Sequence, residues 1–204
     1  MLRLGILASQ NATDMQAIIE AIGTGKLDAK IAILITNKKD SFALERAMRN
    51  DIKAVFLEPK GKSREEFDKE IADTLDEEKV DLILLIGYMR ILSKWFVNRY
   101  KNKILNIHPS LLPAFGQGMD KDVHKKVLDY GCKITGCTLH IVDESVDNGP
   151  IVMQKAVEID EKETVATLRE KVQKAEQEII VKAIMLFCRN KISIEGRKVI
   201  INGA

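Results

Sequence analysis

The chain has 204 residues, of which 46% are hydrophobic and 30% are charged, and this composition is ordinary for a soluble globular protein. Its 32 basic and 30 acidic side chains are mixed along the chain and leave a net charge of +2, which excludes the basic footprint of a nucleic-acid-binding protein. The apolar start turns polar from Ser9 onward, too early for a membrane span or a secretory signal. Three cysteines, Cys132, Cys137 and Cys188, cannot all pair, and they fit a reducing cytoplasm.

The first half of the sequence alternates strand patterns with helix patterns. A capping box at Ser63–Glu66 opens one of the helices, and Asp81–Ile86 is apolar after its first residue, as expected for a central parallel strand. The predicted strands are Leu2–Ala8, Lys30–Thr36, Ala54–Leu57, Asp81–Ile86 and Ile104–His108, and the predicted helices are Asp14–Ile22, Ser41–Asn50, Ser63 to about Lys79, and Ser93–Tyr100. This order predicts an α/β fold with a Rossmann-like, mostly parallel sheet and helices on both faces.

The second half has a different, more antiparallel pattern. The predicted elements are a helix over Val123–Tyr130, strands over Ile134–Val142 and Ile151–Val157, a long helix from about Thr164 to Arg189, and a terminal hairpin turning at Glu195–Arg197. No internal repeat or linker divides the chain, so we predict a single domain over residues 1–204.

Asn106 and His108 lie two residues apart in a predicted strand that Pro109 ends. Because side chains alternate along a strand, the amide and the imidazole project from the same face. In an open α/β sheet, ligands bind outside the carboxyl ends of the strands. The segments Ser9–Asp14, Gly87–Leu92 and Asn106–His108 are therefore expected to border one crevice, although a satisfied core histidine remains the alternative for His108 alone.

Other polar residues admit two interpretations. Cys132, Cys137 and His140 do not predict a metal site, because residues three apart on a strand face opposite sides. His140 either lines the crevice or is a structural histidine, and His124 is expected on a helix surface. The glycine-containing loop Phe115–Met119 is a candidate for a mobile substrate rim.

Several segments together resemble the phosphoribosylglycinamide formyltransferase family of purine biosynthesis. They are Gly87–Ser93, Asn106–Pro113 and Gly136–His140, followed in order by Val142, Asp147, Gly149 and Gln154, and then by Val172–Glu176. The resemblance implies a Rossmann-like formyltransferase domain, with a nucleotide-binding-like half at 1–108 and a folate and active-site half at 109–204. It further implies a cytoplasmic monomer or homodimer that moves a formyl group from the co-substrate 10-formyltetrahydrofolate to the amine of glycinamide ribonucleotide. Small molecules are then the partners, without metal, nucleic acid or membrane.

Carried over residue by residue, the resemblance makes Asn106, His108 and Asp147 the catalytic set. It places folate against Arg64, Met89, Arg90, Ile91, Leu92, Asn106, Val142, Asp143 and Asp147, and the phosphoribosyl substrate against Ala12, Thr13, Asp14, Pro109, Gln173 and Glu176. The chemistry of these residue types agrees. An amide N–H and a protonated imidazole can stabilise the oxyanion formed on the formyl carbon, and an adjacent carboxylate is expected to keep the imidazole charged.

The loop Ser9–Asp14 departs from the glycine-rich family pattern, which ends in Ser-Asn. A carboxylate about 4 Å from a phosphate would repel it by about 4 kcal/mol per unit charge pair at an effective dielectric constant of 20. We therefore expect Asp14 to be the N-cap of the following helix, bonding its first N–H groups and leaning away from the phosphate. A favourable contact with the substrate is the alternative.

Two rival functions remain open from the sequence. A formyltetrahydrofolate deformylase has a similar catalytic domain but hands the formyl group to water. That family usually carries an additional regulatory domain first, whereas this chain starts directly at the first strand, which favours a transferase. A folate- or nucleotide-binding protein without turnover is disfavoured because Asn106, His108 and Asp147 are all present.

Overall fold

A computed structural model describes residues 1–116 and 123–203. Its strands are β1 (Leu2–Ala8), β2 (Ala29–Thr36), β3 (Ala54–Phe56), β4 (Leu82–Leu85), β5 (Ile104–His108), β6 (Ile134–Ile141), β7 (Ile151–Glu158), β8 (Ile192–Glu195) and β9 (Lys198–Ile201). Its helices are α1 (Met15–Gly23), α2 (Phe42–Met48), α3 (Arg64–Glu77), α4 (Lys94–Arg99), α5 (Val123–Asp129) and α6 (Val165–Cys188). None of the helices in the described ranges is long and apolar enough to cross a membrane.

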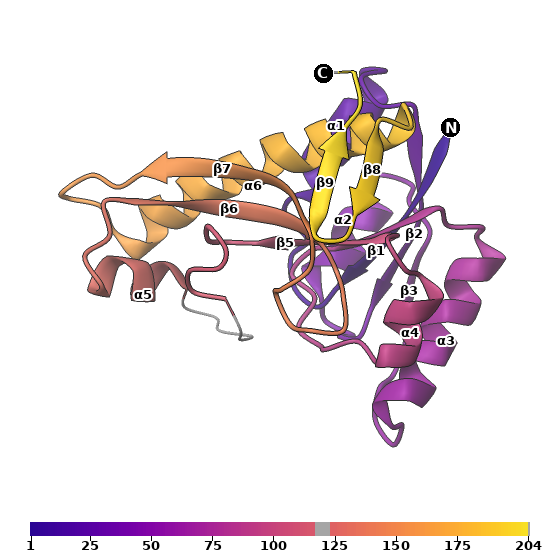
Figure 1. The fold of residues 1–204 in the computed structure, drawn as a ribbon. Helices are drawn as coiled ribbons and strands as arrows, with labels where there is room; N and C mark the ends of the chain where they lie inside the picture. The colour runs from indigo at the N-terminus through magenta and orange to yellow at the C-terminus, as the bar shows by residue number, and fades with distance from the viewer. Residues whose placement is uncertain (117–122, 204) are drawn as a thin grey trace.

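Within the described residues, all strands join one sheet in the order β3-β2-β1-β4-β5-β6-β7-β9-β8 (Figure 1). The pairs from β3 to β5 are parallel, and β6 and β7 then run antiparallel to their preceding neighbours. The predicted α/β class and the more antiparallel C-terminal part are confirmed. β1 lies between β2 and β4, so the strand order reverses there, and a ligand crevice is expected at their carboxyl ends.

The sheet is covered on both faces, because the apolar residues of β4 alternate between two cores. Leu84 packs with the residues of α1 and α6, whereas Ile83 packs with Phe67 of α3 and Phe96 of α4. Figure 1 shows the long strands β6 and β7 reaching toward α5, with α6 lying along them. α6 also packs against α1, in the same hydrophobic core.

Local signals explain where the helices begin. The capping box predicted at Ser63 is confirmed, because its hydroxyl accepts the Glu66 N–H at 3.3 Å and the Glu66 carboxylate accepts the Ser63 N–H at 2.8 Å. Ser93 caps α4 in a similar way by accepting the Phe96 N–H at 3.2 Å. These helix starts position the ends of the loops that border the crevice.

Candidate active site

A cavity of about 750 Å³ lies at the carboxyl ends of β1, β4 and β5. Its wall is formed by the loops after β1 and β4, the end of β5, the loop between β6 and β7, and single residues of α4, β6, α5 and α6. The wall residues are 10–14, 85–92, Val97, 106–109, Val123, His124, His140, 142–147, Arg169, Gln173 and Glu176. The convergence expected from the strand order is therefore present.

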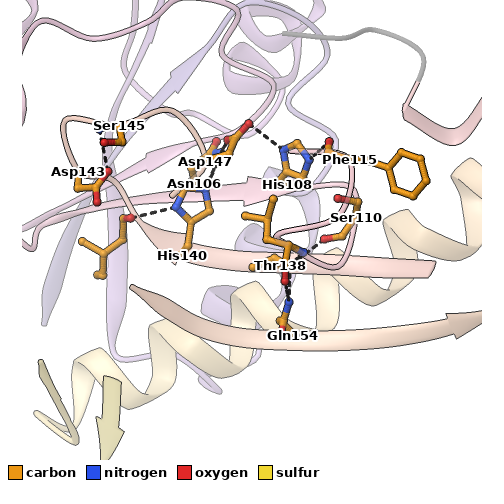
Figure 2. A network of polar contacts seen from close by, with 12 residues as sticks. Asn106, His108, Ser110, Phe115, Thr138, His140, Asp143, Ser145, Asp147 and Gln154 are labelled. Atoms are coloured by element: carbon orange, nitrogen blue, oxygen red, sulfur yellow. Dashed lines mark hydrogen bonds and ion pairs between the residues drawn. The ribbon is translucent and has the colours of Figure 1, made fainter. Parts of the chain in front are cut away.

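β5 holds Asn106 and His108 on one face at the centre of this cavity. Leu105 and Ile107 alternate with them and are buried in the core, which fixes the direction of the two polar side chains. The antiparallel neighbour β6 places His140 directly opposite Asn106 and Thr138 opposite His108. Figure 2 shows the resulting group, with His108 between Asp147 and the backbone of Phe115.

His108 is 5% exposed and has an acceptor at each ring nitrogen. Its Nε2–H donates to the Phe115 carbonyl oxygen at 3.1 Å, and its Nδ1 lies 3.5 Å from Asp147 Oδ2. Both neighbours accept only, so the imidazolium satisfies both of them, with Nε2–H on the Phe115 carbonyl and Nδ1–H facing the Asp147 carboxylate. Burial lowers the pKa of His108 below its usual value, and this effect outweighs the opposing pull of Asp147. The expectation that Asp147 keeps the imidazole charged is therefore corrected, because desolvation is the larger contribution.

His140 fixes the Asn106 amide. Its Nδ1 lies 2.9 Å from the Ile141 carbonyl oxygen and donates to it, so the neutral ring has an accepting Nε2, 3.1 Å from Asn106 Nδ2. The second proton of that amide faces Asp147 Oδ1 at 3.5 Å. His140 therefore lies in the site, and the longer contact of Asn106 is the one that a reacting oxygen can replace.

Asp147 reaches both residues from the loop between β6 and β7. It has a positive φ of 52°, and its side chain is 9% exposed. The loop closes through Gly149, where a Cβ would lie 1.8 Å from the Ile141 carbonyl oxygen. A glycine at this position therefore lets the loop approach β6 closely enough to present Asp147.

The segment after β5 is held by Thr138. Its hydroxyl donates to the Ser110 carbonyl oxygen at 2.7 Å and accepts the Leu112 N–H at 2.9 Å. The Gln154 amide donates to Thr138 Oγ1 and to the Leu112 carbonyl oxygen, each at 2.9 Å (Figure 2). The Leu112–Pro113 peptide bond in this segment is cis. These bonds fix the chain between His108 and Phe115.

The loop after β4 contains four of the residues that were predicted to contact folate. Its residues Met89, Arg90, Ile91 and Leu92 all line the cavity, together with Val142 and Asp143 from the opposite loop. The Arg90 guanidinium lies 4.7 Å from the centroid of the Phe67 ring, and its Nε is buried without a hydrogen-bond partner in the described ranges. Arg64, in contrast, is exposed in the first turn of α3 and lies outside the cavity wall.

All of the residues predicted to contact the phosphoribosyl substrate line the cavity, but the predicted cap bond of Asp14 is wrong. Asp14 occupies the N-cap position of α1 without a side-chain cap bond, because its ψ of −18° is helical rather than extended. Ser41, with a ψ of 127°, does cap α2. Asp14 is instead 4% exposed, and Ala12 before it has a φ of 45°, in the left-handed region that a glycine adopts more easily.

Some lining residues escaped the sequence prediction. His124 is 7% exposed and faces the cavity, so the expected surface position is wrong; burial and the nearby Arg169 guanidinium lower its pKa to about 4. Arg169 lies one turn before Gln173 on α6, and this helical spacing was the only available signal.

Of the expected rim loop, Gln117, Gly118 and Met119 lie outside the described residues. Among the described side chains, no cluster of three or more His, Cys, Asp or Glu could hold a metal.

Comparisons with known proteins agree with this geometry. A family model described as formyl transferase matches residues 2–184. The chain is 36% identical over 204 residues to the phosphoribosylglycinamide formyltransferase of Haemophilus influenzae, covering 100% of this chain and 95% of that protein. A crystal structure of glycinamide ribonucleotide transformylase 1 from Symbiobacterium toebii is similar with a TM-score of 0.94 and 39% identity, over 99% of this chain and 94% of that one.

Two further matches are partial or distant. The chain is 39% identical over 193 residues to the human trifunctional purine biosynthetic protein adenosine-3, which is 94% of this chain but only 19% of that protein. It therefore spans about a fifth of the length of this relative. A formyltetrahydrofolate deformylase from Pseudomonas syringae shares the fold with a TM-score of 0.89, at 21% identity and over 98% of this chain and 66% of that one.

Proposed function

The chain belongs to the formyl transferase family, and from this premise we propose that it transfers the formyl group of 10-formyltetrahydrofolate to the amine of 5'-phosphoribosylglycinamide in purine biosynthesis. The observation that carries the proposal is the meeting of Asn106, His108 and Asp147 in the wall of one large cavity. We assign the folate to the end formed by Met89–Leu92, Val142 and Asp143. The phosphoribosyl group takes the end formed by α1 and α6.

Asn106, His108 and Asp147 suggest how the reaction proceeds. The acceptor amine attacks the formyl carbon, and the carbonyl oxygen becomes an oxyanion. His108 donates to this oxyanion through Nε2–H, which replaces its contact with the Phe115 carbonyl, and Asn106 donates the amide proton that faces Asp147. The intermediate then collapses with cleavage of the bond between the formyl carbon and folate N10.

Proton movement balances this step. The attacking nitrogen loses one proton and folate N10 gains one, with His108 or a water beside it as the carrier. Asp147 favours the imidazolium when the oxyanion forms, because an anion near Nδ1 stabilises the charged ring.

The proposed substrate contacts extend beyond the central group. Pro109, Ala12–Asp14, Gln173 and Glu176 contact the phosphoribosyl substrate, and Arg64 contacts only the part of the folate that extends beyond the cavity. The protein acts in the cytoplasm as a monomer or homodimer. Transfer of the formyl group to water is the second candidate function, because a deformylase shares the fold.

The test measures release of tetrahydrofolate from 10-formyltetrahydrofolate, with and without glycinamide ribonucleotide. Release that depends on the amine, with one formylated product per folate, is the expected result. Equal release without the amine would assign the protein as a deformylase instead. No release in either case would reject both enzymatic functions.

A further inference from the structure

Asp14 and Glu176 face the phosphoribosyl end of the cavity from two different helices. Asp14 lies at the start of α1 and Glu176 in the middle of α6, and both line the cavity wall. Asp14 Oδ1 is buried and has no hydrogen-bond partner among the described residues. An unpaired buried carboxylate oxygen is unfavourable, so the site must supply a proton or a ligand to this atom.

We propose that Asp14 and Glu176 form a carboxyl pair that holds one proton, and that the protonated pair is a specificity element for the phosphorylated acceptor. This inference rests on the proposed function and deepens it. A pair with one proton presents a hydroxyl donor together with acceptor oxygens, and it carries one negative charge instead of two. The loop after β1 can then bind a phosphate group although it contains Asp14.

The surroundings explain why two charges are unfavourable here. Among the described groups, those that act on Asp14 or share its corner are Arg46 on α2, Glu176 on α6 and the Cys137 thiol on β6. Arg46 is the one cation of this set, and it is already bonded to Gln16 Oε1 at 2.9 Å and to the Asn11 carbonyl oxygen at 3.3 Å. Asp14 is buried, Glu176 is half-buried and both line one cavity, so it is unfavourable for both carboxyls to be ionised at neutral pH.

The titration behaviour of the groups agrees with this arrangement. Burial raises the pKa of Asp14 to about 7, and the Arg46 guanidinium only partly opposes this rise. Burial and the neighbouring Asp14 also raise the pKa of Glu176 well above its ordinary value. Both carboxyls, together with burial, raise the pKa of Cys137 to about 12, which keeps that thiol neutral.

Proton and acceptor binding are linked in this arrangement. A phosphate dianion adds negative charge beside the pair and therefore favours its protonated form. Above neutral pH, binding takes one proton from the buffer onto the carboxyl pair. Arg169 lines the same cavity from α6 and supplies positive charge to this end, so the phosphate also meets an attractive group there.

The free protein provides the first test, which does not depend on activity. Carboxyl ¹³C NMR of Asp- and Glu-labelled protein is recorded across the pH range for the wild type, Asp14→Asn and Asp73→Asn. Asp73 is an exposed carboxylate on α3 and serves as the matched control. We expect the Asp14 carboxyl to titrate near neutral pH in the wild type and in Asp73→Asn, and the Glu176 carboxyl to titrate at lower pH in Asp14→Asn than in the wild type, because its neighbouring carboxylate is gone. Titration of every carboxyl below about pH 5 would overturn the shared proton.

Calorimetry with glycinamide ribonucleotide provides the second test. At about pH 8, in two buffers of different ionisation enthalpy, the wild type is expected to take up close to one proton on binding, and Asp14→Asn much less. The ratio of the wild-type KM to the Asp14→Asn KM should rise roughly tenfold between about pH 7 and pH 8.5. A flat ratio, or equal proton uptake, would overturn the linkage. A shared proton without any binding of glycinamide ribonucleotide would instead reject the proposed acceptor.

Discussion

His108 donates its Nε2–H to the backbone carbonyl oxygen of Phe115 at 3.1 Å. This contact aims a ring proton at an acceptor oxygen. In the proposed mechanism, the formyl oxygen takes the place of this carbonyl and receives the same hydrogen bond. The contact therefore holds the imidazole in the orientation that the proposed mechanism requires.

His108 and Asn106 are the two proposed hydrogen-bond donors to the oxyanion, and removing either side chain should slow the chemical step. We expect His108→Ala and Asn106→Ala each to lower kcat by roughly a hundredfold or more, the scale of losing an oxyanion donor or an acid–base group. KM for both substrates should change much less, because the contacts are strongest in the transition state. Steady-state kinetics measure both effects.

Asn98→Ala is the control for amide loss, since Asn98 is exposed and its amide donates to Glu144 Oε1 at 3.0 Å. Its kcat is expected to stay close to that of the wild type. Near-normal turnover in His108→Ala or Asn106→Ala, at unchanged stability, would remove that residue from the catalytic set.

Thr138 should matter for stability as well as for positioning. Thr138→Val keeps the shape of the side chain but leaves the Ser110 carbonyl, the Leu112 N–H and the Gln154 amide without their shared partner. We expect a loss of about 1 to 3 kcal/mol in the free energy of unfolding, the cost of leaving a buried polar group unsatisfied. Urea unfolding followed by circular dichroism measures this change. A neutral substitution would mean that the segment after β5 is held by packing alone.

Periodicity and helix caps were sufficient to predict most of the fold from the sequence. The strand Leu2–Ala8 and the capping box at Ser63 lie where predicted, because both depend on neighbours within a few residues. The parallel pairing of β7 with β9 was not predictable, since it depends on how the terminal hairpin docks on the sheet. Local patterns therefore predict elements, whereas long-range contacts decide the edge of the sheet.

The candidate site was also only partly predictable from the sequence. The period of two placed Asn106 and His108 on one face, but the register that sets His140 opposite Asn106 exists only in the folded sheet. The direction of the pKa shift of His108 also needed the structure, because burial and the Asp147 charge act in opposite directions. Similarly, the missing cap bond of Asp14 follows from its backbone angles rather than from its residue type.

Gly149 should be required for the loop that presents Asp147. In Gly149→Ala, the added Cβ would meet the Ile141 carbonyl oxygen at 1.8 Å, so the backbone must move. We expect a loss of about 2 kcal/mol or more in unfolding free energy and a fall in kcat, because the displaced loop no longer holds Asp147 against His108. Gly23→Ala is the matched control, since nothing lies within 4 Å of its added Cβ. Equal behaviour of the two variants would show that the loop closes without the close approach at Gly149.

Asp147→Asn should shift the pH dependence of catalysis. Burial lowers the pKa of His108 and Asp147 raises it, so loss of the anion should lower this pKa further. In the proposed mechanism His108 acts when protonated, and activity is lost as pH rises through its pKa. We therefore expect the alkaline limb of kcat/KM that belongs to His108 to move to lower pH in the variant, together with a fall in kcat.

Glu144→Gln is the control, because Glu144 lies in the same loop but pairs with Lys94 and Asn98 instead of His108. The alkaline limb of this variant should stay at the wild-type position. An unchanged limb in Asp147→Asn would mean that Asp147 does not set the charge of His108, and its role would then be limited to orienting the Asn106 amide at 3.5 Å.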